Sequence, residues 1–321
     1  MGVPSTAWRE VIPDGEPARL EAFARAIGEL QRTLSERFGP GRAFHRKPVG
    51  ALRASLTVGE LPEVVRQGLF AAPGRHDVWV RLSNGSVRPQ RNSTADIRGF
   101  ALSIRGVAGE SALGGPASSQ DFLLINREVF GFRDVGPFVD LAVAASRGPL
   151  AVLWLFVRTY GFFAGLSEVR RLTSSLGRPF SGFLTEPFFS GVPVKWGPYA
   201  ARLRLQPEQA PRADSAPDLA DEVWARLAHG PARMALQVQL FVDERVTPIE
   251  DASANWDEVD APYHTVGTLE LPAQAPDAAF TAEVEAAAFD PWHALADHRP
   301  LGHVMRARKA AYFTSQQNRS R

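Results

Sequence analysis

Four polar residues near the end of the chain, Arg308, Tyr312, Ser315 and Arg319, follow one another at steps of four, three and four. On an α-helix these steps place side chains on one face, so a tyrosine lies between two arginines. The stripe is polar where a helix packed on a core would be apolar. Because nearby positive charge favours the ionised phenol, ligation of a ferric haem is the use of this tyrosine that also explains the arginines.

The spacing between Arg308 and Tyr312 is weak evidence when it stands alone. Of the 36 basic residues only Lys47, Lys195 and Lys309 are lysines, so arginine is common throughout the chain. Roughly 0.4 matches of this kind are expected by chance. The alternative interpretation is a solvated, arginine-rich terminal helix, and other motifs have to decide between the two.

Composition limits the classes of protein to which the chain can belong. Its 321 residues, 45% of them hydrophobic, predict a globular protein with a large core, and a net charge of +1 gives no reason to expect nucleic acid. The absence of cysteine excludes disulfides, thiolate metal sites and thiol nucleophiles. Residues Met1–Pro13 lack the pattern of a signal peptide, so we expect a cytoplasmic protein.

One apolar segment raises the question of a membrane. Residues Leu150–Val157 are all apolar, and the segment continues past Arg158 through Phe162, Phe163 and Leu166. The run is too short to span a bilayer and contains an arginine, so no transmembrane segment is predicted. We expect a buried helix here, and the alternative is an interfacial helix that collects apolar substrates.

Periodicity predicts the order of the elements. An amphipathic helix is expected over Ala18–Phe38, ended by Gly39-Pro40-Gly41. Strands are expected at Ala51–Val58, Asp77–Ser83, Arg98–Val107, Phe122–Asn126, Ala200–Leu205, Met234–Val242 and His264–Leu271, and helices over Phe138–Leu176, Pro217–His229 and much of the tail from Asp277. With no internal repeat or long linker, we predict one α+β domain over residues 1–321: an antiparallel β-barrel with surrounding helices, including an N-terminal helical segment at 1–40 and a helix at 300–319.

The strand at Asp77–Ser83 carries polar residues on one face only. Val78, Val80 and Leu82 point to one side, whereas Trp79, Arg81 and Ser83 point to the other. If both faces are covered, Arg81 and Ser83 line an interior cavity.

Three further motifs precede the terminal stripe. They are Arg42-Ala-Phe-His45-Arg-Lys47-Pro-Val-Gly50-Ala, Val80-Arg81-Leu82-Ser83, and Asp96-Ile-Arg98-Gly99-Phe100-Ala. Together with Arg308-x3-Tyr312-x6-Arg319 they resemble the haem catalase family, most closely its small catalase-related branch of mini-catalases and catalase-like peroxidases. Four motifs in the correct order are far more specific than one. The resemblance covers most of the chain and is strongest over Arg42–Phe132 and Pro291–Arg319.

The resemblance implies a haem b cofactor (iron protoporphyrin IX) and a role for each matching residue. Tyr312 matches the proximal ligand and is the one implied metal ligand, with Arg308 bonded to its oxygen. His45 matches the distal acid–base histidine, and Ser83 matches the serine that orients it. The remaining cofactor-binding residues implied are the propionate partners Arg42, Arg81 and Arg319, and Phe132 as the aromatic that stacks on the macrocycle.

The distal amide of the larger catalases is where this chain departs from the family. Aligning Arg127 and Phe132 with the family pattern places Ser119 at the amide position, and a slip of one residue places Gln120 there. We predict Gln120 as the catalytic amide because it is the one amide nearby. Its extra methylene changes the reach, and a misplacement of about 1 Å can cost ~100-fold in rate. Peroxidase-type turnover is therefore expected to exceed dismutation of hydrogen peroxide.

The leading hypothesis is a haem peroxidase of the catalase-related type. It would reduce hydrogen peroxide or organic hydroperoxides with a small-molecule electron donor and have weak catalase activity. One alternative is a fatty-acid hydroperoxide isomerase or dehydratase, similar to relatives that make allene oxides, which the apolar segment Leu150–Leu166 would suit. The other is a non-enzymatic barrel that binds haem or lipid. The sequence leaves the oligomeric state open, with a homo-oligomer among the options.

Overall fold

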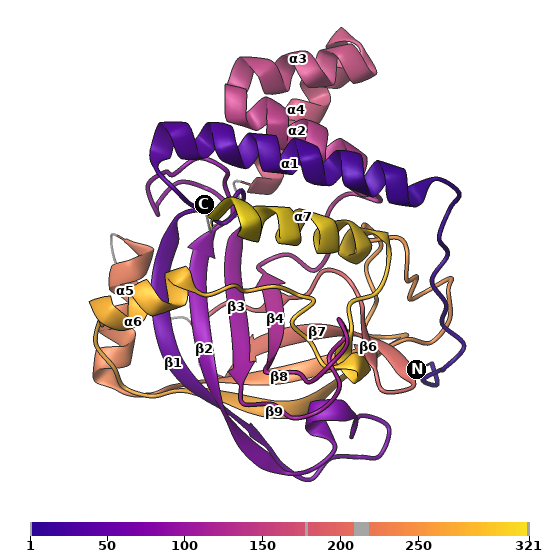
Figure 1. Cartoon of the computed structure of the whole chain (residues 1–321), viewed down its shortest axis with the longest axis vertical. Coiled ribbons are helices and arrows are strands. Elements are labelled where there is room, and N and C mark those ends of the chain that lie inside the picture. Colours follow the sequence, from indigo (N-terminus) through magenta and orange to yellow (C-terminus); the bar gives the residue numbers. More distant parts are fainter. Residues whose placement is uncertain (1, 177–178, 209–217, 320–321) are drawn as a thin grey trace.

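The alternating segments of the sequence pair into one closed sheet. A computed structural model of residues 1–321 describes the chain except for residues 1, 177–178, 209–217 and 320–321. In the described part the strands form an antiparallel sheet in the order β5-β4-β3-β2-β1-β9-β8-β7-β6, and a further pairing of β5 with β7 closes eight of them into a barrel (Figure 1). The strands are β1 (Pro48–Val58), β2 (Gly74–Asn84), β3 (Arg98–Arg105), β4 (Ser119–Ile125), β5 (Phe188–Phe189), β6 (Val194–Trp196), β7 (Tyr199–Pro207), β8 (Ala232–Leu240) and β9 (Tyr263–Leu271). The predicted α+β barrel with surrounding helices is confirmed.

The inner face of the barrel holds the main core. Val80 of β2, Leu102 of β3 and Phe122 of β4 are buried in one cluster with Leu203 of β7 and Leu236 of β8, which come from the other side of the barrel. Burial of these alternating side chains is the main favourable contribution to the closed sheet. It also fixes the register, because a slip of one residue would turn polar side chains inward.

Helix α6 covers part of the outer face of the same strands. Trp79, Ala101 and Leu123 point outward and are partly exposed, and they pack with Phe280 of helix α6. Arg81 and Ser83 belong to this outer face and are nearly completely buried. The predicted alternation along this strand is confirmed, but the covered space that these two residues line lies outside the barrel, under the helices.

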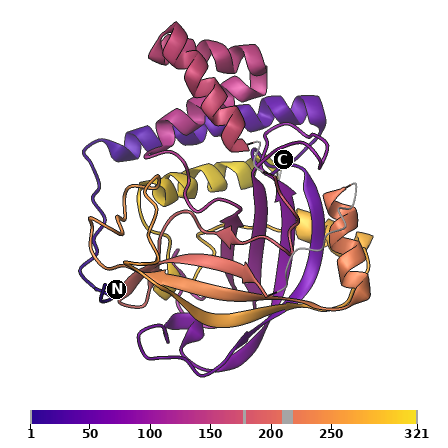
Figure 2. The same cartoon turned by 180° about the vertical axis from the view of Figure 1, so that it is seen from behind.

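Seven helices lie outside the barrel in the described part of the chain. They are α1 (Glu16–Phe38), α2 (Val135–Arg147), α3 (Pro149–Tyr160), α4 (Phe162–Leu176), α5 (Leu219–His229), α6 (Ala278–Ala286) and α7 (His303–Arg319), with short 3-10 turns at Gly68–Phe70 and Ala296–His298. Helix α1 packs along α7, whereas α3 and α4 project beyond α1, away from the barrel (Figures 1 and 2). Gly28 permits the close approach of α1 and α7, because a Cβ there would lie 2.8 Å from Cγ2 of Thr314.

A cluster of charges fixes the first turn of α7. Arg306 donates to Glu10 at 2.9 Å, to Glu16 at 2.9 Å and to Glu250 at 3.0 Å. His303 makes a further short contact with Glu16, whose side chain is 1% exposed. Burial lowers the pKa of Arg306, but these carboxylates outweigh it and hold the pKa above its ordinary value. The helix that carries the terminal arginine–tyrosine stripe is therefore tied to three separate segments.

Most of the predicted elements are found within a few residues of their expected bounds. The helical prediction over Phe138–Leu176 resolves into α2, α3 and α4, and the short strands β5 and β6 were not predicted. The expected start of α5 at Pro217 lies outside the described residues. The single domain over residues 1–321 stays a prediction.

The prediction of a buried helix over the apolar segment is wrong. No residue of α3 is buried, because α3 packs against α2 and α4 and does not reach the barrel core. Among the described residues, no helix combines the length and the apolar character that crossing a membrane would require.

Candidate functional site

His45 lies in the loop between α1 and β1 and is held against the outer face of the sheet. Its backbone adopts φ 50°, and its Nδ1 lies 3.0 Å from the hydroxyl oxygen of Ser83. Ser83 pairs with Gly99 of β3, where a Cβ would lie 2.5 Å from Nδ1 of His45 and 2.8 Å from Oγ of Ser83. Glycine at position 99 is therefore required for the imidazole to occupy this place.

The surroundings of His45 keep its imidazole neutral. Removal from water, followed by the positive charges of Arg81, Arg308 and Arg42, lowers the pKa of His45 to about 3. Nη2 of Arg81 also donates to the backbone carbonyl of His45 at 2.9 Å. A neutral imidazole can accept a proton at ordinary pH, which a general base needs.

Tyr312 and Arg308 lie one turn apart on α7 and are bonded to each other. Nη2 of Arg308 donates to the phenol oxygen of Tyr312 at 2.8 Å, and its guanidinium carbon lies 5.1 Å from the ring centre. Since Arg308 is also among the charges that lower the pKa of His45, α7 and the loop before β1 face the same region. The predicted contact between this arginine and this tyrosine is present in the structure.

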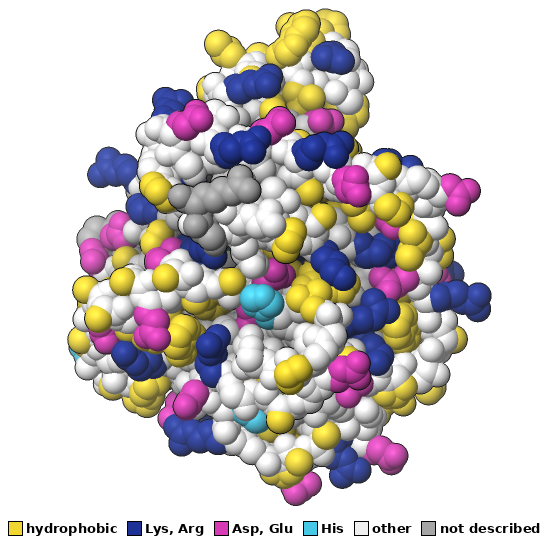
Figure 3. Space-filling model, viewed as in Figure 1, with side chains coloured by type: hydrophobic (Ala, Val, Ile, Leu, Met, Phe, Trp, Pro, Cys, Tyr) yellow, Lys and Arg dark blue, Asp and Glu magenta, His cyan; other side chains and the backbone are white. Residues whose placement is uncertain are grey.

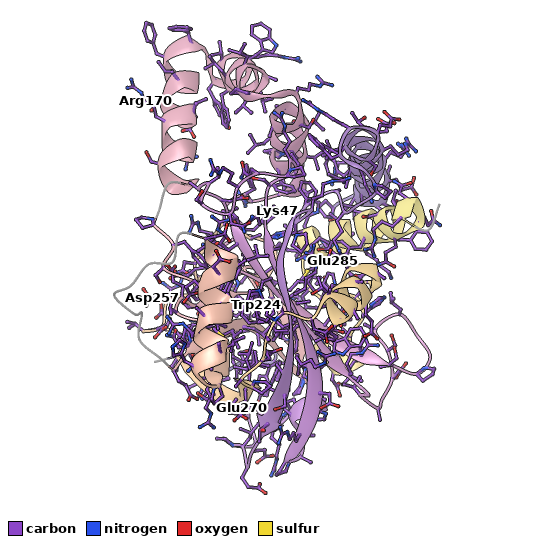
Figure 4. All side chains as sticks on the ribbon, turned by 90° about the vertical axis from the view of Figure 1, so that its left-hand side faces the viewer. Lys47, Arg170, Trp224, Asp257, Glu270 and Glu285 are labelled. Carbon is purple, nitrogen blue, oxygen red and sulfur yellow. The ribbon has the colours of Figure 1, made fainter. Side chains whose placement is uncertain are left out.

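Arg42, Arg81 and Arg319 come together although they are far apart in the sequence. They meet at Glu285, the penultimate residue of α6. Figure 4 labels Glu285 near the end of this helix. Nη1 of Arg42 donates to its carboxylate at 2.9 Å, and Nε and Nη2 of Arg81 donate at 2.6 and 3.0 Å. Arg319 donates to the backbone carbonyls of Glu285 and Ala287 at 3.3 and 3.4 Å. The three guanidinium groups therefore form one cationic group, which we call the arginine trio.

Crowding among these charges shows in their pKa values. Burial, followed by the charge of Arg81, lowers the pKa of Arg42 to about 9, and burial likewise lowers the pKa of Arg319. Burial raises the pKa of Glu285, but its hydrogen bonds with Arg81 and the charges of Arg81 and Arg42 outweigh this and lower it. Glu285 is thus an ionised counter-charge to the trio.

The trio matches the chemistry of a haem edge. The carboxylate of Glu285 accepts hydrogen bonds from Arg42 and Arg81, as the carboxylate of a propionate would. Each guanidinium group has five N–H donors, so donors remain for further carboxylates. Three guanidinium charges and one carboxylate leave a net charge of +2, which two propionates would neutralise. The partly exposed, apolar Ala101 and Leu123 on the sheet beside them suit a flat apolar ring. The residues present therefore fit an iron protoporphyrin.

Phe132 lies in an aromatic cluster that reaches the loop carrying His45. Its ring centre is 5.9 Å from those of Phe130 and Phe138, and Phe138 is 5.1 Å from Phe44, the residue before His45. The cluster supports the loop that carries His45 from the side of α2. That Phe132 stacks on a cofactor stays a prediction.

The structure does not bring Gln120 to His45. Strand β4 reaches the level of Ser83 and Gly99 at Ile125, and Gln120 lies five residues earlier, about 17 Å along a strand. An odd separation also places Gln120 on the face opposite to Ile125, with the barrel core.

The amide of Gln120 already has partners in that position. Its Oε1 accepts from the backbone N–H of Leu295 at 2.9 Å, and its Nε2 donates to the carbonyl of Asp121 at 3.4 Å. Ser119 shares the outer face with Ile125 but lies one residue further away. Gln120 was predicted from its amide group, without regard to the two-residue period of the strand. Its position in the structure does not support the prediction that it is the catalytic amide.

Two residues of the group were not singled out from the sequence. Gly99 stands inside a quoted motif, and a glycine beside a charged strand end is a signal of close approach. Glu285 has no local signal, because it is 204 residues from Arg81 and 243 residues from Arg42. Only the fold brings it to them.

Comparisons with known proteins bear on the fold. The sequence matches no family model, and no curated protein matches it. The structure is similar to a fungal catalase (TM-score 0.69, 20% identity), a bacterial catalase (TM-score 0.66, 19% identity) and catalase A from Saccharomyces cerevisiae (TM-score 0.69, 18% identity). Each alignment covers 99% of this chain but 65%, 63% and 67% of the respective catalase. The chain thus has the fold of the catalases over about two thirds of their length.

Proposed function

We propose that this chain, which has the fold of the catalases, holds haem b through Tyr312 and reduces hydrogen peroxide or organic hydroperoxides at the expense of an organic donor, with weak catalase activity. One observation carries the proposal: a neutral imidazole, an arginine-bonded phenol and the arginine trio share one electrostatic environment. Arg81, Arg42 and Arg308 all act on His45, and Arg308 donates to Tyr312.

Each residue has a distinct part in the proposed reaction. Haem, when bound, would supply an iron that binds the peroxide and accepts its oxidising equivalents. His45 would take a proton from one peroxide oxygen and return it to the other as the bond between them breaks. Ser83 holds Nδ1 of His45, which leaves Nε2 for this transfer.

The remaining residues would hold the cofactor. Arg308 would keep its hydrogen bond to the ligating oxygen of Tyr312, and the arginine trio would bind the propionates. Gln120 has no part in this proposal, because its side chain lies on the other face of β4.

The absorption spectrum of the purified, haem-reconstituted protein tests the cofactor assignment. We expect the signature of tyrosinate-ligated ferric haem, its loss in Tyr312→Phe, and its retention in Tyr160→Phe, which changes an exposed tyrosine of α3. A protein that stays colourless after reconstitution, or a spectrum that survives Tyr312→Phe, would exclude Tyr312 as the ligand.

Replacement of His45 separates an enzyme from a carrier. His45→Gln is expected to keep the haem spectrum and lose ~100-fold or more in peroxide turnover, which is the usual contribution of general acid–base catalysis. His229→Gln is the control, since His229 is exposed on α5. Turnover unaffected by His45→Gln would favour a barrel that binds haem or lipid without catalysis.

Rearrangement of a fatty-acid hydroperoxide is the second candidate. The observation that favours it is the exposed apolar surface of α3 and α4, which would suit a lipid. Incubation with a fatty-acid hydroperoxide and a reducing donor distinguishes the two. Rearranged product formed without consumption of the donor would favour isomerisation or dehydration, and reduced alcohol with consumption of the donor would favour peroxidase turnover.

A further inference from the structure

Helices α3 and α4 form a hairpin whose large apolar side chains face solvent. Every described side chain of α3 is at least partly exposed, although its sequence is almost entirely apolar. Phe163 at the turn is 86% exposed and Trp154 is 66% exposed. The other exposed large apolar side chains of the hairpin are Leu150, Tyr160, Phe162 and Leu166. Single exposed apolar residues are ordinary, but six large ones on one short helical hairpin mark an interaction surface.

The hairpin stands at one end of the molecule. It projects from α1 and α2 away from the barrel, so its outer side can meet a broad surface without obstruction from the rest of the chain (Figures 1 and 2). Figure 3 shows hydrophobic side chains at this end with basic side chains beside them. The candidate haem residues lie on the other side of α1 and α2, on the outer face of the sheet.

The charges of the hairpin are mostly positive. Residues 149–176 contain three arginines, Arg158, Arg170 and Arg171, and one acidic residue, Glu168, which pairs with Arg171 at 2.7 Å. Arg158 is exposed at the end of α3, and Arg170 points outward from α4 (Figure 4). The hairpin therefore carries a net charge of +2 beside its exposed aromatic rings.

We propose that the α3–α4 hairpin binds an anionic phospholipid surface. Tryptophan, tyrosine and phenylalanine enter the boundary between headgroups and acyl chains, and arginines beside them meet the phosphates. A second copy of the chain fits less well, because the same positive charges would face each other in a symmetric contact. The helices are too short to span a bilayer, so the contact is peripheral.

Sedimentation of the full chain with lipid vesicles tests this without reference to haem or peroxide. We expect binding to phosphatidylcholine vesicles that contain phosphatidylserine, weaker binding to pure phosphatidylcholine, and loss of the difference at high salt. Phe162→Ser with Phe163→Ser should weaken binding ~100-fold, as expected when two aromatic side chains no longer leave water. Val259→Ser is the matched control, because Val259 is exposed outside the hairpin.

A second variant keeps the proposal testable if the double variant does not fold. Arg158→Gln leaves the aromatic side chains in place and should weaken binding to phosphatidylserine vesicles about fivefold, with little effect on pure phosphatidylcholine. No binding by the parent chain at low salt would overturn the proposal. So would concentration-dependent self-association in ultracentrifugation that Phe162→Ser with Phe163→Ser abolishes, since the hairpin would then bind a second copy.

Discussion

A single added methyl group at Gly99 tests whether the placement of His45 matters for turnover. In Gly99→Ala the new Cβ would lie 2.5 Å from Nδ1 and 2.7 Å from Cε1 of His45. Ordinary contact between such atoms begins near 3.5 Å, so the imidazole has to move by roughly 1 Å. The Cβ would also lie 2.8 Å from Oγ of Ser83, so the hydrogen bond that holds the ring is disturbed as well.

The size of the effect follows from that displacement. A group moved by about 1 Å from its productive position costs ~100-fold in rate, and overpacking of a buried position costs about 1 to 3 kcal/mol of stability. The three atoms nearest to the new Cβ belong to His45 and Ser83, whereas Tyr312 and its partner Arg308 lie on α7, so haem binding should persist. The variant is therefore expected to be coloured, folded and about 100-fold slower.

Peroxide consumption with an organic donor, measured per bound haem, is the assay. Gly59→Ala is the matched control, because a Cβ at Gly59 would meet no atom within 4 Å. Unchanged turnover per haem in Gly99→Ala, with the parent spectrum, would refute the argument that β3 sets the position of the imidazole. Loss of haem together with turnover would instead show that Gly99 shapes the cofactor site itself.

Two further predictions concern charge and stability. Glu285→Gln should destabilise the haem-free protein on the order of 2 kcal/mol, because it leaves the arginine trio without a counter-charge. Bound propionates should reduce this loss of stability. Thermal unfolding with and without haem measures both effects, and Glu270→Gln, at a partly exposed ion pair, is the control. His298 is fully buried and its pKa is lowered from 6.5 to about 4. Between these two pH values the imidazole is protonated in the unfolded chain but not in the folded chain. The free energy of unfolding should therefore fall as pH is lowered across that window, by up to about 1.4 kcal/mol per pH unit. Denaturation of His298→Asn at several pH values should show a smaller dependence, and an unchanged dependence would contradict the assignment.

Local patterns predicted the barrel well because the inward apolar side chains of its long strands recur at every second position. Inward residues such as Val80 and Leu102 repeat every second position, which is visible without knowledge of their partners. Strands β5 and β6 are too short to show a period, and their pairing depends on neighbours in the closed sheet. The prediction that α3 is buried was wrong for a related reason: an apolar sequence does not show whether the helix packs on the core of the protein.

The candidate site likewise contains residues that local sequence signals reveal and residues that only the fold brings together. Motifs singled out His45, Ser83, Tyr312 and the arginine trio, because these residues lie at recognisable spacings within short segments, and their roles stay predictions. Gln120 was chosen by its chemistry, and the strand period then put it on the wrong side of β4 for contact with His45. Glu285 could not be found, because its only signal is a meeting of α6, the loop before β1 and strand β2.

A comparison of the two histidines with lowered pKa values shows why His45, which is partly exposed, and not the fully buried His298 is proposed for catalysis. Both have lowered pKa values because burial disfavours the charged imidazole. Nε2 of His298 accepts from the backbone N–H of Leu69 at 3.0 Å, and its ring lies 4.5 Å from that of Trp196. Its Nδ1 has no partner among the described residues, and the charges that act on its pKa come from Asp297 and Lys195 and not from arginines. The imidazole of His45 is bonded, within the described part of the chain, through Nδ1 alone. It is also surrounded by three arginines that would repel a cation but attract the carboxylates of a cofactor. The proposed reaction needs an unprotonated imidazole beside a carboxylate-binding group, and of the two histidines His45 alone has the arginines of such a group beside it in the described part of the chain.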